Sequence, residues 1–342
     1  MPVKLGSKDR PMLPPLVGST FLKSPKVAID ELGPNNIAVV GIPYEGTKVS
    51  RLGCKNGPTA IREATFMFAY LLQSLAGAAM VDPVTGATIR ESTSNDLVDV
   101  GDLGMIQPDV HESIKVMSDG LREITRTGAF PVVLGGDHFV TFPAVQGFVE
   151  GLKERGGNHT VGYIQVDAHI DLADSNPFFG KYNSGTQVRR MIDTVGLDPK
   201  KMMIIGVGGL QPKAEWDFGK EVGIEFVLRH DIQNAKSIRK LIQNATARLA
   251  DCTEIYVSID IHIVDKIYAP GVGNVVGAGG LNPPQLIEIL ETLRELPLGA
   301  VDLVEVAPNF DVSGRTASLA ALLITTLLDN RLFDRSDAPA RS

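Results

Sequence analysis

Cysteine is scarce in this chain of 342 residues, which has only Cys54 and Cys252. Two thiols so far apart cannot form the disulfide framework of small secreted domains, and their scarcity is typical of a reducing compartment. Either one is equally explained as a small buried apolar residue. The first residues have no apolar run of signal-peptide length, and no later run reaches the roughly 18 residues of a membrane span. We therefore expect a cytoplasmic protein with no membrane partner.

Clusters of lysine and arginine are also missing, and the net charge is -7. A chain without a basic stripe has little to attract phosphates, so nucleic acid is not an expected partner. Aromatic residues make up only 6%, but 44% of the residues are hydrophobic and 21% are charged. This composition is typical of a soluble globular protein with enough apolar material for a core.

Eight short apolar runs alternate with longer segments of helical length. The runs cover residues 36–44, 97–104, 129–138, 160–171, 201–209, 224–232, 254–263 and 301–308. Near-continuous runs rich in Val and Ile indicate strands whose sheet is covered by helices on both faces. Segments 60–78, 238–250 and 283–296 are long enough for crossover helices. The sequence thus predicts the α/β class with a parallel, doubly wound sheet.

The chain shows no internal repeat, low-complexity tract or interdomain linker. We therefore predict one domain over residues 30–335. The proline-rich residues 1–29 are predicted to form an N-terminal arm, and residues 336–342 a C-terminal tail.

Polar residues gather where the predicted strands end, which is where open α/β sheets place their ligand sites. His138 follows the glycines of LGGDH, although a lone histidine there is equally explained as a structural residue. Asp167, His169 and Asp171 alternate in QVDAHID, so an extended backbone would project all three to one side. Three such side chains are costly to bury unless a cation compensates them. We expect a metal site here; the alternative is a satisfied polar network.

Two further strand ends carry polar residues. In SIDIHIVD, an extended backbone would send Ser258, Asp260 and His262 to one face and the isoleucines to the other. In DLVEVAP, Glu305 ends an apolar run and could face a cationic group. The sequence therefore predicts that four strand ends contribute to one polar site.

These segments resemble the four signatures of the ureohydrolase family, which includes arginase, agmatinase and formimidoylglutamase. They are GGDH, DAHID, SIDIHIVD running into YAPGVG, and VEVAPNFDVSGRTA. The stretch GIPYEGTKVSRLGCKNGPTAIREAT is similar to the agmatinase-side motif, so the resemblance covers about residues 38–325. It implies one three-layer α/β domain with a mainly parallel eight-stranded sheet, assembled in trimers or hexamers. It also implies a two-metal centre that hydrolyses a guanidino or related C-N bond.

The resemblance further assigns roles by position. The implied ligands of one ion are His138, Asp167, Asp171 and Asp260, and those of the other are Asp167, His169, Asp260 and residue 262. Glu305 matches the glutamate that contacts the guanidinium of the substrate, and Asp171 matches the carboxylate that helps to pass a proton.

His262 departs from the family pattern Ser-x-Asp-x-Asp. Three aspartates give -3 against the +4 of two divalent ions, where the family has four aspartates. An imidazole ligand also moves the preference of a site from Mn²⁺ toward Ni²⁺, Zn²⁺ or Fe²⁺. We expect two divalent ions, nickel or manganese, with His262 as a nitrogen ligand; the alternative is that position 262 has lost its ligand function.

Two other departures concern the substrate. Ser184 in GKYNSGTQVRR stands where agmatinases and arginases carry a histidine that shuttles protons, which argues against ordinary arginase chemistry. Formimidoylglutamase-like members share this serine, and we expect Ser184 to line the substrate site. The segment YAPGVGNVVGAGG lacks the usual Thr and Pro, so its selectivity differs, or it is only a flexible connection.

The expected function is hydrolysis of a small cationic guanidino compound: guanidine, an alkylguanidine, guanidinobutyrate, agmatine or a biguanide such as metformin. No cluster of arginines that would bind an amino-acid carboxylate is visible, which disfavours arginine as the substrate. The alternative, from a different functional class, is a catalytically weak or inactive helper subunit. Such a subunit assembles with a homologous chain, while substitutions accumulate in its own metal site.

Overall fold

The core of the protein is a single sheet of eight strands, all parallel, in the order β4-β1-β5-β10-β9-β6-β7-β8. The computed structural model describes residues 19–47, 51–68, 76–83, 86, 88–105, 108–274 and 279–334. The strands are β1 Asn36–Ile42, β4 Asp96–Asp102, β5 Phe130–Gly135, β6 Val161–Val166, β7 Met202–Val207, β8 Glu225–Leu228, β9 Glu254–Asp260 and β10 Leu298–Val304. Each overlaps one of the eight predicted runs, although β4 and β10 begin one and three residues before theirs, so the α/β class and the eight-stranded parallel sheet are confirmed.

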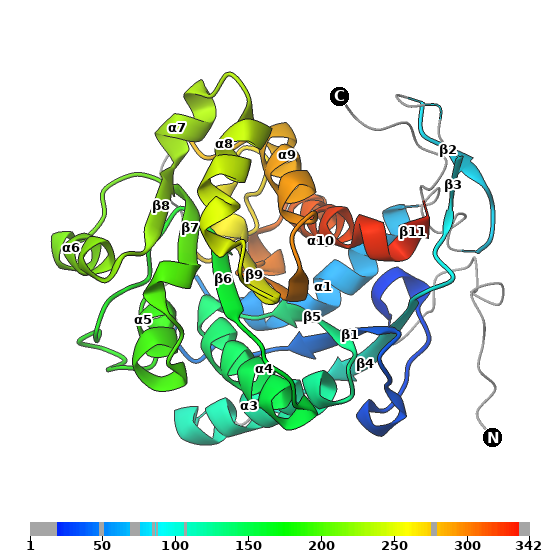
Figure 1. Cartoon of the computed structure of the whole chain (residues 1–342), viewed down its shortest axis with the longest axis horizontal. Helices are drawn as coiled ribbons and strands as arrows, with labels where there is room; N and C mark the ends of the chain where they lie inside the picture. Colours follow the sequence, from blue (N-terminus) through cyan, green and yellow to red (C-terminus); the bar gives the residue numbers. More distant parts are fainter. Residues whose placement is uncertain are drawn as a thin grey trace.

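Helices cover both faces of the sheet, which gives three layers (Figure 1). Two helices pack on one face: α3 Val110–Arg126 and α4 Thr141–Arg155. Four pack on the other: α1 Gly57–Ala64, α8 Ile238–Thr246, α9 Pro283–Leu293 and α10 Arg315–Leu332. Three further helices follow β6, β7 and β8: α5 Gln187–Arg190, α6 Lys213–Val222 and α7 Arg229–Asn234. Because both faces are buried, the strands need apolar side chains on each side, as their Val and Ile content predicted.

Helix ends depart from the predicted segments. The segment 60–78 is helical as α1 only to Ala64, and a 3-10 turn continues it to Met67; residues 69–75 lie outside the described part. A small antiparallel sheet that the sequence analysis did not predict joins β2 Met80–Val81, β3 Thr88–Glu91 and β11 Phe333–Asp334. Strands this short carry too few residues for a period of two to be visible in the sequence.

The predicted N-terminal arm and C-terminal tail stay predictions, because residues 1–18 and 335–342 lie outside the described ranges. Within the predicted N-terminal arm, Phe21 and Leu22 are buried in the core, and the Phe21 N–H donates to Asp99 Oδ2 at 2.9 Å. Among the residues that the structure describes, no helix combines the length and the apolar character needed to span a bilayer.

The strand order explains why four distant motifs can share one site. The strands that lead into GGDH, VEVAP, SIDIHI and DAHID are β5, β10, β9 and β6, which are the four central strands in that spatial order. Their ends are in register: Leu303 pairs with Leu134, Val304 with Asp260, and Val166 with Ile259. All four carboxyl ends therefore meet at the middle of one edge of the sheet.

Helices α3 and α4 approach closely because α4 carries glycine at two positions one turn apart. A Cβ at Gly147 would lie 2.1 Å from the carbonyl oxygen of Ser118, and one at Gly151 would lie 2.7 Å from that of Arg122. Neither backbone oxygen can move without shifting α3. The two helices are therefore packed backbone to backbone, and a methyl group cannot be inserted between them.

Replacing Gly147 with alanine should lower the free energy of unfolding by about 1 to 3 kcal/mol, because overpacking outweighs the roughly 1 kcal/mol by which alanine favours a helix. Urea denaturation followed by circular dichroism measures this change. Gly33→Ala is the control, since no atom lies within 4 Å of a Cβ at that position. Equal stability of the two variants would contradict the close packing.

Candidate metal centre

His138 is placed at the sheet edge by the turn that follows β5. The turn passes so close to Tyr44 that a Cβ at Gly136 would lie 1.9 Å from the Tyr44 carbonyl oxygen, so this position requires glycine. The carboxylate of Asp137 caps the 3-10 turn at His138 by accepting from the Phe139 N–H. The His138 side chain is 2% exposed, and its Nε2 lies 3.2 Å from Ser258 Oγ.

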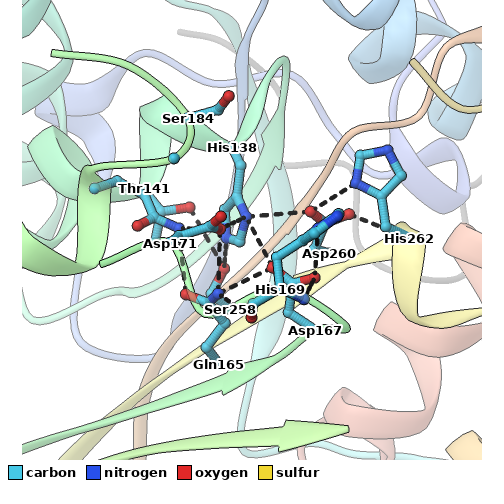
Figure 2. A network of polar contacts seen from close by, with 12 residues as sticks. His138, Thr141, Gln165, Asp167, His169, Asp171, Ser184, Ser258, Asp260 and His262 are labelled. Carbon is cyan, nitrogen blue, oxygen red and sulfur yellow. Dashed lines mark hydrogen bonds and ion pairs between the residues drawn. The ribbon is translucent and has the colours of Figure 1, made fainter. Parts of the chain in front are cut away.

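The other ring nitrogen of His138 faces three carboxylates. Its Nδ1 lies 3.3 Å from Asp167 Oδ2, 3.1 Å from Asp171 Oδ2 and 3.2 Å from Asp260 Oδ2. Figure 2 shows these side chains converging from the ends of different strands. The structure thus brings His138 and the three aspartates together, as the sequence analysis predicted.

The residues of DAHID do lie close together, but the extended backbone predicted for them is wrong. β6 ends at Val166, so Asp167, His169 and Asp171 lie on a loop and not on an extended strand. Asp171 has a φ of +48°, a left-handed conformation that costs of order 1 kcal/mol or more in a residue other than glycine. Asp167 Oδ1 accepts the backbone N–H of His169 at 2.9 Å and lies 3.4 Å from His169 Nδ1. A turned loop, not alternation, collects the three side chains.

His262 is also placed by a turn and not by strand alternation. β9 ends at Asp260, and a 3-10 turn over Ile261–Ile263 follows. The His262 Nε2 accepts the backbone N–H of Asn274 at 3.2 Å. The ring proton is therefore on Nδ1, which lies 2.9 Å from Asp260 Oδ2 and donates to it. A cation that binds Nδ1 must take the place of that proton.

Burial and mutual contact shift the pKa values of the cluster. Burial opposes the charge of His138, but the three carboxylates around its Nδ1 raise its pKa well above the usual value. Burial likewise opposes the charge of His169, but Asp167 raises its pKa to about 10. The pKa of Asp171 is raised by burial and by Asp167, while His262 and His138 hold that of Asp260 well below its usual value against the effect of burial. The carboxylates thus attract positive charge strongly.

The arrangement fits divalent cations. Two groups of three side chains, His138 with Asp167 and Asp171, and His169 with Asp260 and His262, each hold their ligand atoms within 4.8 Å of one another. His138 Nδ1 is buried and has no aligned hydrogen-bond partner among the described residues, although three carboxylate oxygens surround it. One proton can satisfy only one of these oxygens, whereas one cation can bind all of them. These are therefore candidate metal-binding groups.

Glu305 lies near the Nε2 side of the His262 ring, whereas Asp260 lies at its Nδ1. It directly follows β10, has a φ of +71° and is 1% exposed. Its Oε1 accepts the His138 N–H at 2.9 Å, and its Oε2 lies 3.8 Å from His262 Nε2. The thiol of Cys54 donates to Oε2 at 3.4 Å. Glu305 is thus a fixed buried carboxylate next to the cluster.

Ser184 lies apart from the three aspartates (Figure 2). Its backbone N–H donates to Thr47 Oγ1 at 3.2 Å, and Thr47 Oγ1 donates to Asp137 Oδ2 at 2.8 Å. This chain of hydrogen bonds ties the loop of Ser184 to the turn that carries His138. A substrate-binding role for Ser184 stays a prediction.

The sequence analysis missed three buried residues at the site. Gln165 and Gln187 donate to Asp167 and Asp171, and Cys54 donates to Glu305. A signal existed for Gln165, because an amide side chain stands among the apolar residues of β6 two positions before Asp167, and so on the same side of an extended backbone. For Gln187 and Cys54 no comparable signal exists, since both come from segments outside the strands.

Fold and site together define a class: parallel α/β proteins with a cluster of histidines and carboxylates at the carboxyl edge of the central strands. The model of the Arginase family matches residues 35–329. The chain belongs to this family, and the resemblance to the ureohydrolases is confirmed.

Curated relatives cover most of this chain. The mitochondrial guanidino acid hydrolase of Homo sapiens is 32% identical over 292 residues, which are 85% of this chain and 77% of that protein. The guanidinopropionase of Pseudomonas aeruginosa is 30% identical over 315 residues, or 90% of each chain. The solved structure of proclavaminate amidino hydrolase from Streptomyces clavuligerus is 26% identical, with a TM-score of 0.75, and covers 92% of this chain and 97% of that one.

Uptake of a divalent cation at pH 7 should release protons, because a histidine must lose its ring proton before that nitrogen can bind metal. His169, with a pKa of about 10, still holds its proton at pH 7, so affinity should rise with pH up to about 10. Calorimetric titration in two buffers of different ionisation enthalpy measures the number released. His169→Asn should lower that number, and His111→Asn, outside the cluster, should not. Heats that are equal in both buffers would contradict the prediction.

Proposed function

We propose that this protein is a metal-dependent hydrolase that cleaves a C-N bond of a small guanidino compound. One observation carries the proposal: a buried imidazole nitrogen faces three carboxylates at 3.1 to 3.3 Å, and a fourth carboxylate, Glu305, lies beside this cluster. The three carboxylates around the imidazole suit the cations of a metal centre, and the separate carboxylate of Glu305 suits a cationic substrate. The family supports the same reaction class, since its matched relatives are named as hydrolases of guanidino compounds.

Six residues would hold two divalent ions, nickel or manganese. The ligands of one would be His138, Asp167, Asp171 and Asp260, and those of the other Asp167, His169, Asp260 and His262. Such a centre lowers the pKa of a water molecule and so supplies a nucleophile at neutral pH. His169 keeps 34% of its side chain exposed, more than the other members, so water and substrate would approach from its side.

Glu305 and Asp171 would act on the substrate. The Oε2 of Glu305 would accept charge-assisted hydrogen bonds from the planar guanidinium and so fix its carbon near the aspartates. Burial and the neighbouring Asp167 raise the pKa of Asp171, which makes its carboxylate a better proton acceptor than an ordinary aspartate. Asp171 would therefore take a proton from water and give it to the departing nitrogen.

The proposed substrates are guanidine, an alkylguanidine, guanidinobutyrate, agmatine or a biguanide such as metformin. The relatives name guanidino acids and guanidinopropionate, and agmatine is named for a relative from Gallus gallus. We further propose a trimer or hexamer in the cytoplasm, which native mass spectrometry and fractionation would examine.

A second candidate function is a helper subunit with a weak or absent centre. One observation favours it: the Nε2 of His262 accepts the Asn274 N–H, and Nδ1 donates to Asp260. In this arrangement no lone pair of His262 is directed at the aspartates. The second ion would then lose one of its four ligands, and a homologous chain would supply the activity.

The metal-loaded protein should hydrolyse at least one compound of a guanidino panel, with release of urea, a substituted urea or an amine. Glu305→Gln should lower kcat/KM about 100-fold, because a charged hydrogen bond is worth roughly 1.5 to 3 kcal/mol. The amide oxygen can still accept from the His138 N–H, so the fold should persist. Cys54→Ala is a control that keeps this carboxylate. Activity unchanged in Glu305→Gln would exclude the assigned role.

Metal preference should change with residue 262. The parent should bind two ions and turn over faster with Ni²⁺ than with Mn²⁺, and His262→Asp should move toward Mn²⁺, because oxygen ligands suit manganese better than imidazole does. Elemental analysis and turnover after separate loading measure both effects, with the exposed His230→Asp as the control. A parent that holds at most one ion, and a variant that gains a second ion with new activity, would favour the helper subunit.

A further inference from the structure

Two buried glutamines lie directly behind the aspartates. Gln165 and Gln187 are both fully buried, and they come from different parts of the chain, β6 and the start of α5. Gln165 Nε2 donates to Asp167 Oδ2 at 2.9 Å and to Asp171 Oδ2 at 3.3 Å. Gln187 Nε2 donates to the same Asp171 oxygen at 3.0 Å. Figure 2 shows Gln165 below the cluster, on the sheet side of Asp171.

The orientation of the Gln165 amide is fixed by its other contacts. Its Oε1 accepts from Tyr163 OH at 2.9 Å and from Gln187 Nε2 at 3.2 Å. Rotating the amide by half a turn would place its oxygen against two carboxylates and its NH₂ group against two donors. The hydrogen-bond network therefore permits one orientation only, with the donors toward the aspartates.

Asp171 needs such support more than its neighbours do. It lies on a loop beyond β6 with a φ of +48°, which is a strained backbone conformation for a residue other than glycine. Contacts of its side chain must therefore help to hold it in place. Gln165 approaches it from the sheet and Gln187 from the segment that follows the loop. Both amides donate to Oδ2, the Asp171 oxygen that also faces His138 Nδ1, so they hold this oxygen toward the cluster.

The donors are neutral, and this matters at a site for cations. A lysine or arginine at either position would also hold the carboxylates, but its positive charge would oppose a divalent ion a few ångströms away. An amide supplies N–H groups without adding charge, so the three aspartates keep their -3 for the ions. Amide donors thus orient the carboxylates at no electrostatic cost to metal binding.

We propose that Gln165 and Gln187 form an amide pair that positions the carboxylates of Asp167 and Asp171 for a divalent ion. The proposal rests on the metal centre of the proposed function. The two glutamines would act through the aspartates, because their amide nitrogens donate to the carboxylate oxygens. Loss of partners of this kind typically lowers metal affinity by about 10- to 100-fold.

The test measures metal affinity, not turnover. Gln187→Met keeps the length of the side chain and removes the donor, and Gln165→Met does the same behind both aspartates. Each purified full-length variant is titrated with Mn²⁺ and with Ni²⁺, and bound metal per chain is counted by elemental analysis. We expect one of the two ions to bind about 10- to 100-fold more weakly than in the parent. The double variant should lose less than the sum, because both amides serve Asp171.

Two controls separate positioning from general damage. Thr325→Val removes a buried hydroxyl that donates to Leu322 O in α10, away from the site, and should leave metal affinity unchanged. Gln187→Asn covers the case in which the methionine variants fail to fold, since it keeps the amide but moves it away from Asp171. It too should weaken binding of one ion.

Folded variants that bind both ions within twofold of the parent would overturn the proposal, as would a parent that binds no divalent ion. If the parent binds two ions and the variants lose affinity, the amide pair holds even where the guanidino panel gives no product. In that case the hydrolase assignment fails alone, so the two conclusions are tested separately.

Discussion

The site depends on one electrostatic constraint: three carboxylates are buried within about 3 Å of a single imidazole nitrogen. Ionised carboxylates that are removed from water repel one another strongly unless positive charge lies between them. The central strands, the Gly136 turn and the left-handed residues Asp171 and Glu305 all serve to hold these groups together despite that repulsion. Such an arrangement is costly in a structural core, and its presence at the edge of the sheet indicates a purpose other than stability.

The two halves of the cluster differ in how completely they are built. His138, Asp167 and Asp171 are largely enclosed, and two glutamine amides donate to the aspartates. On the other half, His169 is partly exposed, and His262 uses both ring nitrogens within the protein. The first half is therefore the more enclosed, whereas in the second half His262 would have to give up the proton on Nδ1 or the Asn274 N–H on Nε2 before it could bind an ion. Position 262, at which the sequence departs from the Ser-x-Asp-x-Asp pattern, belongs to this second half.

Sequence patterns predicted the strands and the parallel sheet, because strands that are buried on both faces consist mostly of apolar residues. They also predicted the residues of the cluster, which follow these apolar runs. They predicted the wrong backbone for His169, Asp171 and His262, since a turn that brings side chains together leaves no periodic signal. The insertion of β10 between β5 and β9 was not readable either, as strand order is set by long-range packing. Gln187 escaped notice for a similar reason: nothing in its segment shows that α5 packs behind Asp171.

The central position of β10 has a consequence for how the molecule assembles. This strand is the last of the sheet to be synthesised, yet it lies between β5 and β9 and joins the two halves of the sheet. Until residues 298–304 arrive, β5 and β9 each present an unpaired edge, and such edges are prone to pair with other chains. During synthesis, therefore, neither closure of the sheet nor completion of the polar cluster is possible before this strand arrives. A nascent chain that stops before residue 298 would have neither, and it would expose the two strands most in need of a partner.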